Sequence, residues 1–280
     1  MATEKDEKSV YAATWDKYVT EDFPKIQAGP RRTKDDLRSW QVLNTSDEAY
    51  VWPGDEWGDA QAVARILETC VFPYLDAAPG LLCELASGGG RITSAVLRKY
   101  PQARLECFDI SSEFLDQIHR RFSPEIAAGR VGTTLLTSDP QVMYRTIRQR
   151  AGQGQVDCIF SFDAMVHVEL HSIVLYLATA AATLKPGGLV AMNVADGSRE
   201  PGFHKLLFNA PGVFRQGGTA GPQFQFASPD IIAMVLERFG FSYEFHECNN
   251  RDLFFSALLQ DPGAARRSFE TAGSTWWFME

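Results

Sequence analysis

The residues best suited to chemistry in this chain of 280 residues surround a turn rich in glycine. The apolar run 81–86 leads into Gly88–Gly90, and a helix-like pattern begins at Arg91. A strand, a glycine turn and a helix in this order are typical of a nucleotide site. The next strand-like run ends at Asp109, nineteen residues after Gly90. A carboxylate about 20 residues beyond such a turn binds ribose hydroxyls, so the spacing predicts a cofactor that contains adenosine.

The charges around this turn favour S-adenosylmethionine over a dinucleotide. A pyrophosphate needs bare backbone N–H groups without negative charge nearby, whereas Glu84 lies just before the turn and suits an ammonium group. Thr93 also stands where the dinucleotide motif G-x-G-x-x-G has its third glycine. S-adenosylmethionine has no phosphate and carries an ammonium, a sulfonium and a ribose. We expect it to be bound by Glu84, Ala86, Ser87, Gly88, Gly90, Asp109 and Ile110.

A second group of candidates lies at and just after the end of the strand-like run 156–162. Phe162, Asp163 and His167 would lie at the carboxyl edge of a parallel sheet, beside the glycine turn. We expect Phe162 to contact the cofactor and His167 to act as a general base, since the unperturbed pKa of histidine is about 6.5. Asp163 would orient the imidazole or contact the cofactor. The structural alternatives are that His167 caps or packs against the next helix, and that Asp163 is a carboxylate favoured by the helix dipole.

Further polar residues are candidates for contacts with an acceptor molecule. Asn193 and Asp196 end the fifth strand-like run and would face the same edge of the sheet. Asp196 precedes Gly197, so a simple turn is the alternative there. His204, in the segment that follows, completes this set of expected acceptor contacts.

Aromatic residues near the N-terminus could close over the site. Tyr11 and Trp15 are four residues apart and would share one face of a helix. Over a sulfonium, such rings contribute a cation–π attraction of about 0.5–2 kcal/mol. Trp57 is a similar candidate. Packing against the sheet is the alternative for all three side chains.

The elements that must position these residues alternate between strand and helix patterns, which predicts a doubly wound α/β fold. The run 169–184 has apolar residues at helical spacing and is stopped by Lys185–Gly188. Asn249-Asn250 is a hairpin signal between the last two strands. We therefore expect a seven-stranded, mostly parallel sheet with a terminal antiparallel hairpin, within a domain spanning 61–260. Its strands are expected at 81–86, 104–109, 132–137, 156–162, 188–194, 241–247 and 253–259.

Three segments lie outside the alternating pattern. Residues 1–60 are expected to form a helical, aromatic lid, and residues 197–228 a glycine- and proline-rich insertion. A loop of this length is commonly functional, and its place after the fifth strand predicts a cap over the acceptor. Residues 261–280 form a tail in which Trp276 and Trp277 are expected to pack or to make a homodimer contact.

The glycine turn resembles the first motif, E-x-G-x-G-x-G, of class I S-adenosylmethionine-dependent methyltransferases. Ala86 stands in place of the first glycine, and because alanine tolerates positive φ poorly, we expect the turn to differ slightly there. The resemblance covers roughly 55–260 and implies that Asp139 meets the adenine amino group, with a turn before Pro140 as the alternative. It also rests on the runs Glu56–Gly58, Phe72–Leu75, Phe160–Val168, Leu184–Gly188 and Arg251–Ala257.

The resemblance implies a small-molecule methyltransferase of the kind that acts on sugars or secondary metabolites. We expect in-line transfer to a hydroxyl oxygen with His167 as base. Transfer to an amine or a carboxylate by positioning alone remains open, as do a NAD-dependent oxidoreductase and a non-catalytic cofactor-binding protein. His167 and His171 lie four residues apart, but no third ligand is evident, so no metal is expected.

Composition narrows the partners and the compartment. A net charge of −8 disfavours binding to nucleic acids and to anionic membranes. No run is long enough to span a membrane, and the charged N-terminus is unlike a signal peptide. The five cysteines include no C-x-x-C pair, which indicates a reducing compartment. We therefore expect a cytoplasmic enzyme with a small-molecule acceptor.

Overall fold

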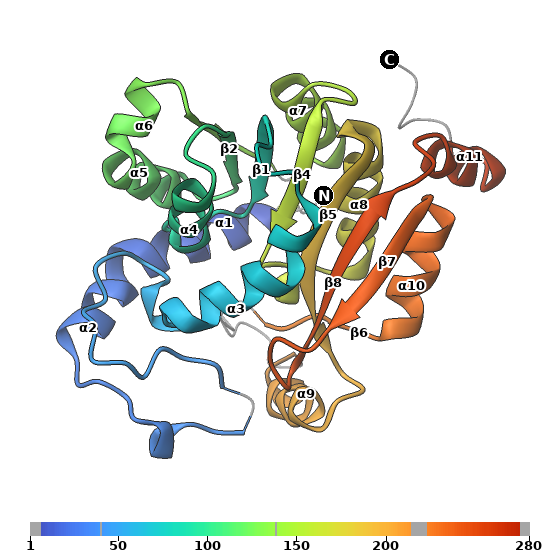
Figure 1. The fold of residues 1–280 in the computed structure, drawn as a ribbon. Coiled ribbons are helices and arrows are strands. Elements are labelled where there is room, and N and C mark those ends of the chain that lie inside the picture. The colour runs from blue at the N-terminus through green and yellow to red at the C-terminus, as the bar shows by residue number, and fades with distance from the viewer. Residues whose placement is uncertain (1–6, 40, 138, 214–222, 275–280) are drawn as a thin grey trace, which may run out of the picture.

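A sheet of mostly parallel strands forms the centre of the molecule, with helices on both faces (Figure 1). The computed structural model describes residues 7–39, 41–137, 139–213 and 223–274. The strands pair in the order β3-β2-β1-β4-β5-β8-β7, and β8 is antiparallel to both of its neighbours. The predicted doubly wound fold with a terminal antiparallel hairpin is confirmed. The strands are β1 Leu81–Leu85, β2 Arg104–Asp109, β3 Val131–Leu135, β4 Val156–Ser161, β5 Leu184–Asp196, β6 Phe226–Ala227, β7 Phe241–His246 and β8 Asp252–Leu259.

The sheet has eight strands among the described residues, one more than the sequence predicted. The additional strand, β6, has two residues and pairs in parallel with Ala195 and Asp196 at the end of β5. Two residues are too few to show an alternating pattern, which explains why the sequence did not reveal this strand. Its effect is to fix the segment after residue 223 against the carboxyl end of β5.

Helices connect the strands and cover both faces of the sheet. The segment 197–228, expected to be a loop, contains a helix of 14 residues, α9. A β-carbon at Gly202 would lie 1.8 Å from the carbonyl oxygen of Asp196, so this glycine allows α9 to approach the end of β5. The helices are α1 Glu7–Lys17, α2 Phe23–Ala28, α3 Ala60–Cys70, α4 Arg91–Lys99, α5 Ser112–Arg121, α6 Ser123–Ala127, α7 Pro140–Ala151, α8 Leu170–Thr183, α9 Glu200–Val213, α10 Pro229–Arg238 and α11 Ala264–Thr271, with short helical turns at Tyr18–Asp22, Lys34–Asp36, Asp55–Trp57, Phe72–Tyr74 and Met165–His167.

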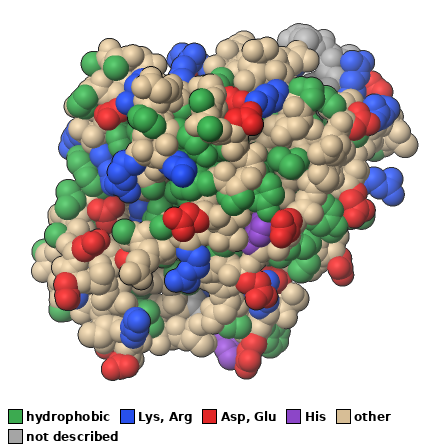
Figure 2. Space-filling view, in the orientation of Figure 1, with side chains coloured by type: hydrophobic (Ala, Val, Ile, Leu, Met, Phe, Trp, Pro, Cys, Tyr) green, Lys and Arg blue, Asp and Glu red, His purple; other side chains and the backbone are tan. Residues whose placement is uncertain are grey.

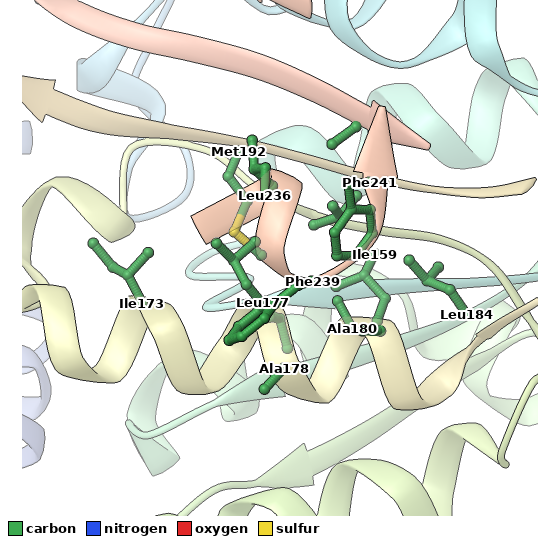
Figure 3. Close-up of a cluster of buried hydrophobic side chains, with 14 of the residues drawn as sticks. Ile159, Ile173, Leu177, Ala178, Ala180, Leu184, Met192, Leu236, Phe239 and Phe241 are labelled. Carbon is green, nitrogen blue, oxygen red and sulfur yellow. The ribbon is translucent and has the colours of Figure 1, made fainter. Parts of the chain in front are cut away.

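Two apolar clusters hold the layers together, one on each face of the sheet. In the cluster of Figure 3, Leu177 of α8 and Leu236 of α10 pack around Met192 of β5, and all three side chains are fully buried. Strands such as β1 are buried on both faces, as expected for parallel strands between two helical layers. This rigid sheet places the ends of β1, β2, β4 and β5 along one edge.

The two ends of the chain add elements outside the sheet. The α1 helix contacts α5, near the carboxyl ends of the first strands (Figure 1). In the C-terminal segment, the ring of Phe269 in α11 packs 5.7 Å from that of Phe239. Trp276 and Trp277, predicted to pack or to contact a second copy, lie outside the described residues. Within the part of the chain that is described, every helix is too short or too polar to cross a membrane.

Candidate functional site

The glycine turn between β1 and α4 lies directly against the N-terminal segment. Ala86 has a φ of 55°, so it occupies the left-handed region that glycine favours. Alanine adopts this conformation at a cost of about 1–2 kcal/mol, so the turn takes a left-handed backbone at Ala86 although the residue is not glycine. A β-carbon at Gly89 would lie 2.1 Å from the carbonyl oxygen of Pro53, so glycine is required for this close approach.

We expect Gly89→Ala to displace the segment around Pro53 and to weaken cofactor binding. The new methyl group would meet backbone rather than a movable side chain, and overpacking of this kind costs about 1–3 kcal/mol. Hydrogen exchange of residues 50–58 and the dissociation constant for S-adenosylmethionine would measure the two effects. Gly80→Ala is the matched control, because a β-carbon there makes only ordinary contact, 3.5 Å from Asp157. Unchanged exchange in Gly89→Ala would contradict the expected displacement.

Two buried carboxylates stand at the ends of β1 and β2. Glu84 accepts a hydrogen bond from the hydroxyl of Thr93, and burial raises the pKa of Glu84 to about 8. The carboxylate of Asp109 accepts hydrogen bonds of 2.9 Å from the backbone nitrogens of Gly88 and Ser111. Burial raises the pKa of Asp109 to about 6. A cation placed beside these groups would favour their ionised forms.

The imidazole of His167 lies at the carboxyl edge of β4, in a setting that keeps it neutral. Its Nδ1 atom is 3.3 Å from the carbonyl oxygen of Gln223, which can only accept a hydrogen bond. Nδ1 therefore carries the proton and Nε2 keeps its lone pair. Burial lowers the pKa of His167 to about 4, with smaller contributions from Arg251 and Lys205.

Asp163 is held in an unusual conformation beside His167. Its φ of 64° is rare for a residue other than glycine, and such strain clusters at functional sites. Its backbone nitrogen donates to Asn193 Oδ1 at 2.8 Å, and its carboxylate pairs with Arg91 at 2.5 Å. The carbonyl of Gln223, rather than Asp163, makes the hydrogen bond that orients the imidazole.

Aromatic side chains from the N-terminal segment close over the same edge. The hydroxyl of Tyr11 donates to the carbonyl oxygen of His167 at 2.7 Å. The ring of Trp15 lies 5.5 Å from that of His167 and 5.9 Å from that of Trp57. Asp16 accepts a 2.6 Å hydrogen bond from Ser111, which joins α1 to the start of α5. The segment is thus attached to the site by hydrogen bonds as well as by ring contacts.

These groups line one open cavity, whose empty space is about 820 Å³ including the part open to solvent. Ser87 lines it as well, and its buried hydroxyl has no hydrogen-bond partner among the described residues, which leaves it available to a ligand. The cavity contains twelve residues singled out from the sequence: Tyr11, Trp15, Trp57, Glu84, Ala86, Ser87, Gly88, Asp109, Ile110, Phe162, Asp163 and His167. The cavity is also lined by residues that were not predicted to contact the cofactor, among them Pro53, Gly54, Gly89, Arg91, Phe114 and Tyr176.

Five predicted site residues lie elsewhere. Gly90 is the N-cap residue of α4 and packs against Phe122. Asp139 caps α7 by accepting hydrogen bonds from the backbone nitrogens of Gln141 and Val142. Asn193 is fully buried and holds the backbone of Asp163. Asp196 is occupied by the backbone and hydroxyl of Ser198 and by Arg199. His204 is exposed, and its Nδ1 atom lies 3.2 Å from the hydroxyl oxygen of Ser39. In the structure Asp139 thus caps a helix, and Asp196 holds the turn that follows β5.

A second hollow, with about 800 Å³ of empty space including the part open to solvent, adjoins the first cavity. The two share Trp15, Trp57, Asp163 and His167, so they meet at the imidazole. The hollow is otherwise lined by Tyr18, Val42, Val166, Lys205, Phe224 and Arg251. Sequence motifs gave no sign of Lys205 or Phe224, because both lie in the segment expected to be a loop. Among the described residues, no cluster of three or more histidine, cysteine, aspartate or glutamate side chains is arranged for a metal ion.

Comparisons with known proteins agree with this architecture. Residues 82–188 match the model of a family described as a methyltransferase domain. No curated protein matches the chain in sequence. Magnesium protoporphyrin IX methyltransferase from Synechocystis PCC 6803, solved with S-adenosylhomocysteine, is similar in structure, with a TM-score of 0.56 and 14% identity over 91% of this chain and 100% of that one.

Two further structures are similar to the chain. An O-methyltransferase family protein from Burkholderia thailandensis has a TM-score of 0.56 and 16% identity, covering 72% of this chain and 56% of that one. Human N-acetylserotonin methyltransferase, solved with S-adenosylmethionine, has a TM-score of 0.51 and 17% identity, covering 71% of this chain and 52% of that one. The chain thus spans about half the length of these two proteins, and the likeness concerns the fold. Together with the family match, it shows that residues 82–188 resemble a methyltransferase domain in sequence and that the chain has the fold of S-adenosylmethionine-dependent methyltransferases.

Proposed function

We propose that the chain transfers a methyl group from S-adenosylmethionine to an oxygen of a small polar acceptor, such as a sugar or a secondary metabolite. The observation that carries this proposal is the pair of adjoining hollows that meet at His167. A cofactor in the first and an acceptor in the second would face each other across the imidazole. Holding two reactants in line supplies much of the catalysis in such a displacement.

The first cavity suits the groups of the cofactor, which supplies a methyl group on a cationic sulfur. In this proposal Glu84 binds the ammonium group, Asp109 binds the ribose hydroxyls, and the hydroxyl of Ser87 forms a further hydrogen bond. Trp15 and Trp57 exclude water and attract the sulfonium through their ring faces. Residues 1–60 then act as the lid of the cofactor cavity, and residues 197–228 as the cap of the acceptor.

His167 is proposed to take the acceptor proton through Nε2. A pKa of about 4 makes it a weak base. It is nevertheless sufficient, because an oxygen that gains a methyl group becomes strongly acidic as the new bond forms. The low pKa also fits a second candidate, in which an amine or a carboxylate accepts the methyl group and His167 only positions it.

Calorimetric titration tests the cofactor half of this proposal. We expect S-adenosylmethionine and S-adenosylhomocysteine to bind, and Asp109→Ala to weaken both at least tenfold through the loss of two hydrogen bonds to the ribose. Unfolding curves would verify that the variant is folded. A folded wild-type protein that binds neither molecule, or an Asp109→Ala variant with unchanged affinity, would overturn the assignment. A panel of hydroxyl, amine and carboxylate acceptors, followed by formation of S-adenosylhomocysteine, tests the second half.

A further inference from the structure

The second hollow gathers positive charge in a protein that is acidic overall. The chain carries a net charge of −8, and on the face drawn in Figure 2 acidic and basic side chains are interspersed. The hollow, by contrast, is lined by two cations, Lys205 and Arg251, and by one acid, Asp163. Asp163 pairs with Arg91 of the glycine-turn helix. Arg251 pairs likewise with Asp252, which lies outside the lining. The lining itself thus carries one more cation than acid, a balance that favours a ligand with negative charge.

The two cations converge on one aromatic ring beside the imidazole. Lys205 Nζ lies 4.8 Å from the centre of the Phe224 ring, and Arg251 Cζ lies 4.6 Å from it. The ring of Phe224 is itself 4.9 Å from that of His167. A small molecule in the hollow could therefore reach a cation at one end and the imidazole at the other.

Arg251 is rigidly placed for this role. Its guanidinium is buried and makes two hydrogen bonds of 2.6 Å to the carboxylate of Asp252. Such a bidentate pair fixes the plane of the guanidinium. Arg251 comes from the β7–β8 hairpin and Lys205 from α9, so the sheet and the insertion each supply one cation.

Lys205 stands among other positive charges. Burial, and to a smaller extent Arg251 and Arg38, lower the pKa of Lys205 to about 8. The guanidinium of Arg38 contacts Phe208 at 4.5 Å, and Lys205 Nζ lies 5.4 Å from the same ring. Neighbouring cations repel one another, and a bound anion between them would offset that repulsion.

We propose that the acceptor carries an anionic group, a carboxylate, phosphate or sulfate, which binds between Lys205 and Arg251 while the methyl-accepting atom faces His167. This inference rests on the proposed function for the identity of the reaction, but the anion site itself can be tested without turnover. The aromatic lining, Trp15, Tyr18, Trp57 and Phe224, suits an apolar or aromatic body between the two polar ends.

The test compares matched ligands that differ in charge. Benzoate, phenyl phosphate and neutral benzamide would be titrated into the full chain, with and without S-adenosylhomocysteine, and followed by tryptophan fluorescence, because Trp15 and Trp57 line the hollow. We expect the anions to bind at least tenfold more tightly than benzamide, the effect of one charge-assisted hydrogen bond. Lys205→Met should reduce that preference, and Lys205→Arg should restore it. The preference should also decline above pH 8, where Lys205 loses its proton.

Lys99→Met is the matched control, because Lys99 also packs over a phenylalanine ring, 5.3 Å from Phe72, but lies outside the hollow. Anions that bind no better than benzamide would overturn the inference, as would a preference that survives in Lys205→Met. Lack of binding by S-adenosylhomocysteine would instead contradict the proposed function. The two failures are thus distinguishable in one set of titrations.

Discussion

Replacing His167 with alanine is expected to lower kcat by a factor of about 10²–10⁴ with a hydroxyl acceptor, which is the usual contribution of a positioned general base. The reason is that Nε2 keeps its lone pair while Nδ1 donates to the carbonyl of Gln223. The affinity for S-adenosylmethionine should change little, since Glu84 and Asp109 remain in place. Single-turnover kinetics with an acceptor from the panel would measure the effect.

The pH dependence of the wild-type enzyme follows from the same residue. Because burial lowers the pKa of His167 to about 4, the ring is neutral and able to accept a proton throughout pH 5–9. We therefore expect no decline of kcat between pH 8 and pH 5 from this group, and a loss only as the pH falls through about 4. An ordinary surface histidine would give a decline near pH 6.5.

His167→Gln is the control for size and polarity, because glutamine fills much of the space but takes no proton. If alanine and glutamine both reduce kcat strongly while the dissociation constant of the cofactor is unchanged, His167 acts as base. Activity close to that of the wild type in either variant would favour an amine or a carboxylate acceptor, which needs no base.

The sequence predicted those parts of the site that lie next to a strong local pattern. Glu84, Asp109 and Phe162 end buried apolar runs, and the position of each run in a parallel sheet determines where its end lies. Tyr11 and Trp15, which line the cavity, were found because their spacing places both on one helical face. In each case a periodic pattern and one rule about strand or helix geometry were sufficient to predict that the residue lies at the site.

Residues brought together by distant parts of the chain had no such pattern. Lys205 and Arg251 are separated by 46 positions, and they meet only because α9 returns to the end of β5 beside the β7–β8 hairpin. The glycines and prolines of 197–228 indicated a loop, whereas α9 accommodates Gly202 where close approach to β5 requires it. The side chain of Asn193 likewise faces the backbone of Asp163, a contact that no spacing rule predicts.

Replacing Glu84 with glutamine is expected to weaken binding of S-adenosylmethionine by about 10- to 100-fold at pH 8, the magnitude of a charge-assisted hydrogen bond. In the protein alone, burial raises the pKa of Glu84 to about 8, and the nearby carboxylate of Asp109 raises it as well. The hydroxyl of Thr93, Arg91 and Arg121 act in the opposite direction. Glu84 is thus largely protonated at pH 7 and must lose its proton to bind an ammonium group.

Cofactor binding should therefore release protons in the wild type. As the pH increases from 6 to 8, the affinity for S-adenosylmethionine is expected to rise by up to tenfold per pH unit, because the ionised form of Glu84 becomes more abundant. Above pH 8 it should decline again, since an α-amino group with a pKa of about 7.7–8.0 loses its own charge. Calorimetry in buffers of different ionisation enthalpy would count the protons. Glu84→Gln should release no proton at this position. Its loss of affinity relative to the wild type should therefore be largest at pH 8 and smallest at pH 6.

The carboxyl group of Glu84, whose ionisation favours cofactor binding, should lower the stability of the protein alone when it ionises. Its raised pKa means that folding favours the protonated form, so the stabilisation is complete below about pH 4.5 and is lost as the pH rises towards 8. Glu84→Gln should therefore melt at a higher temperature than the wild type at pH 8, with little difference at pH 5, although it binds the cofactor less tightly. Glu106→Gln is the control, because Glu106 is a buried carboxylate of the neighbouring strand that pairs with Arg104 and lies outside the cavity. A pH-independent affinity in the wild type, or equal proton release by Glu84→Gln, would show that Glu84 does not bind the ammonium group.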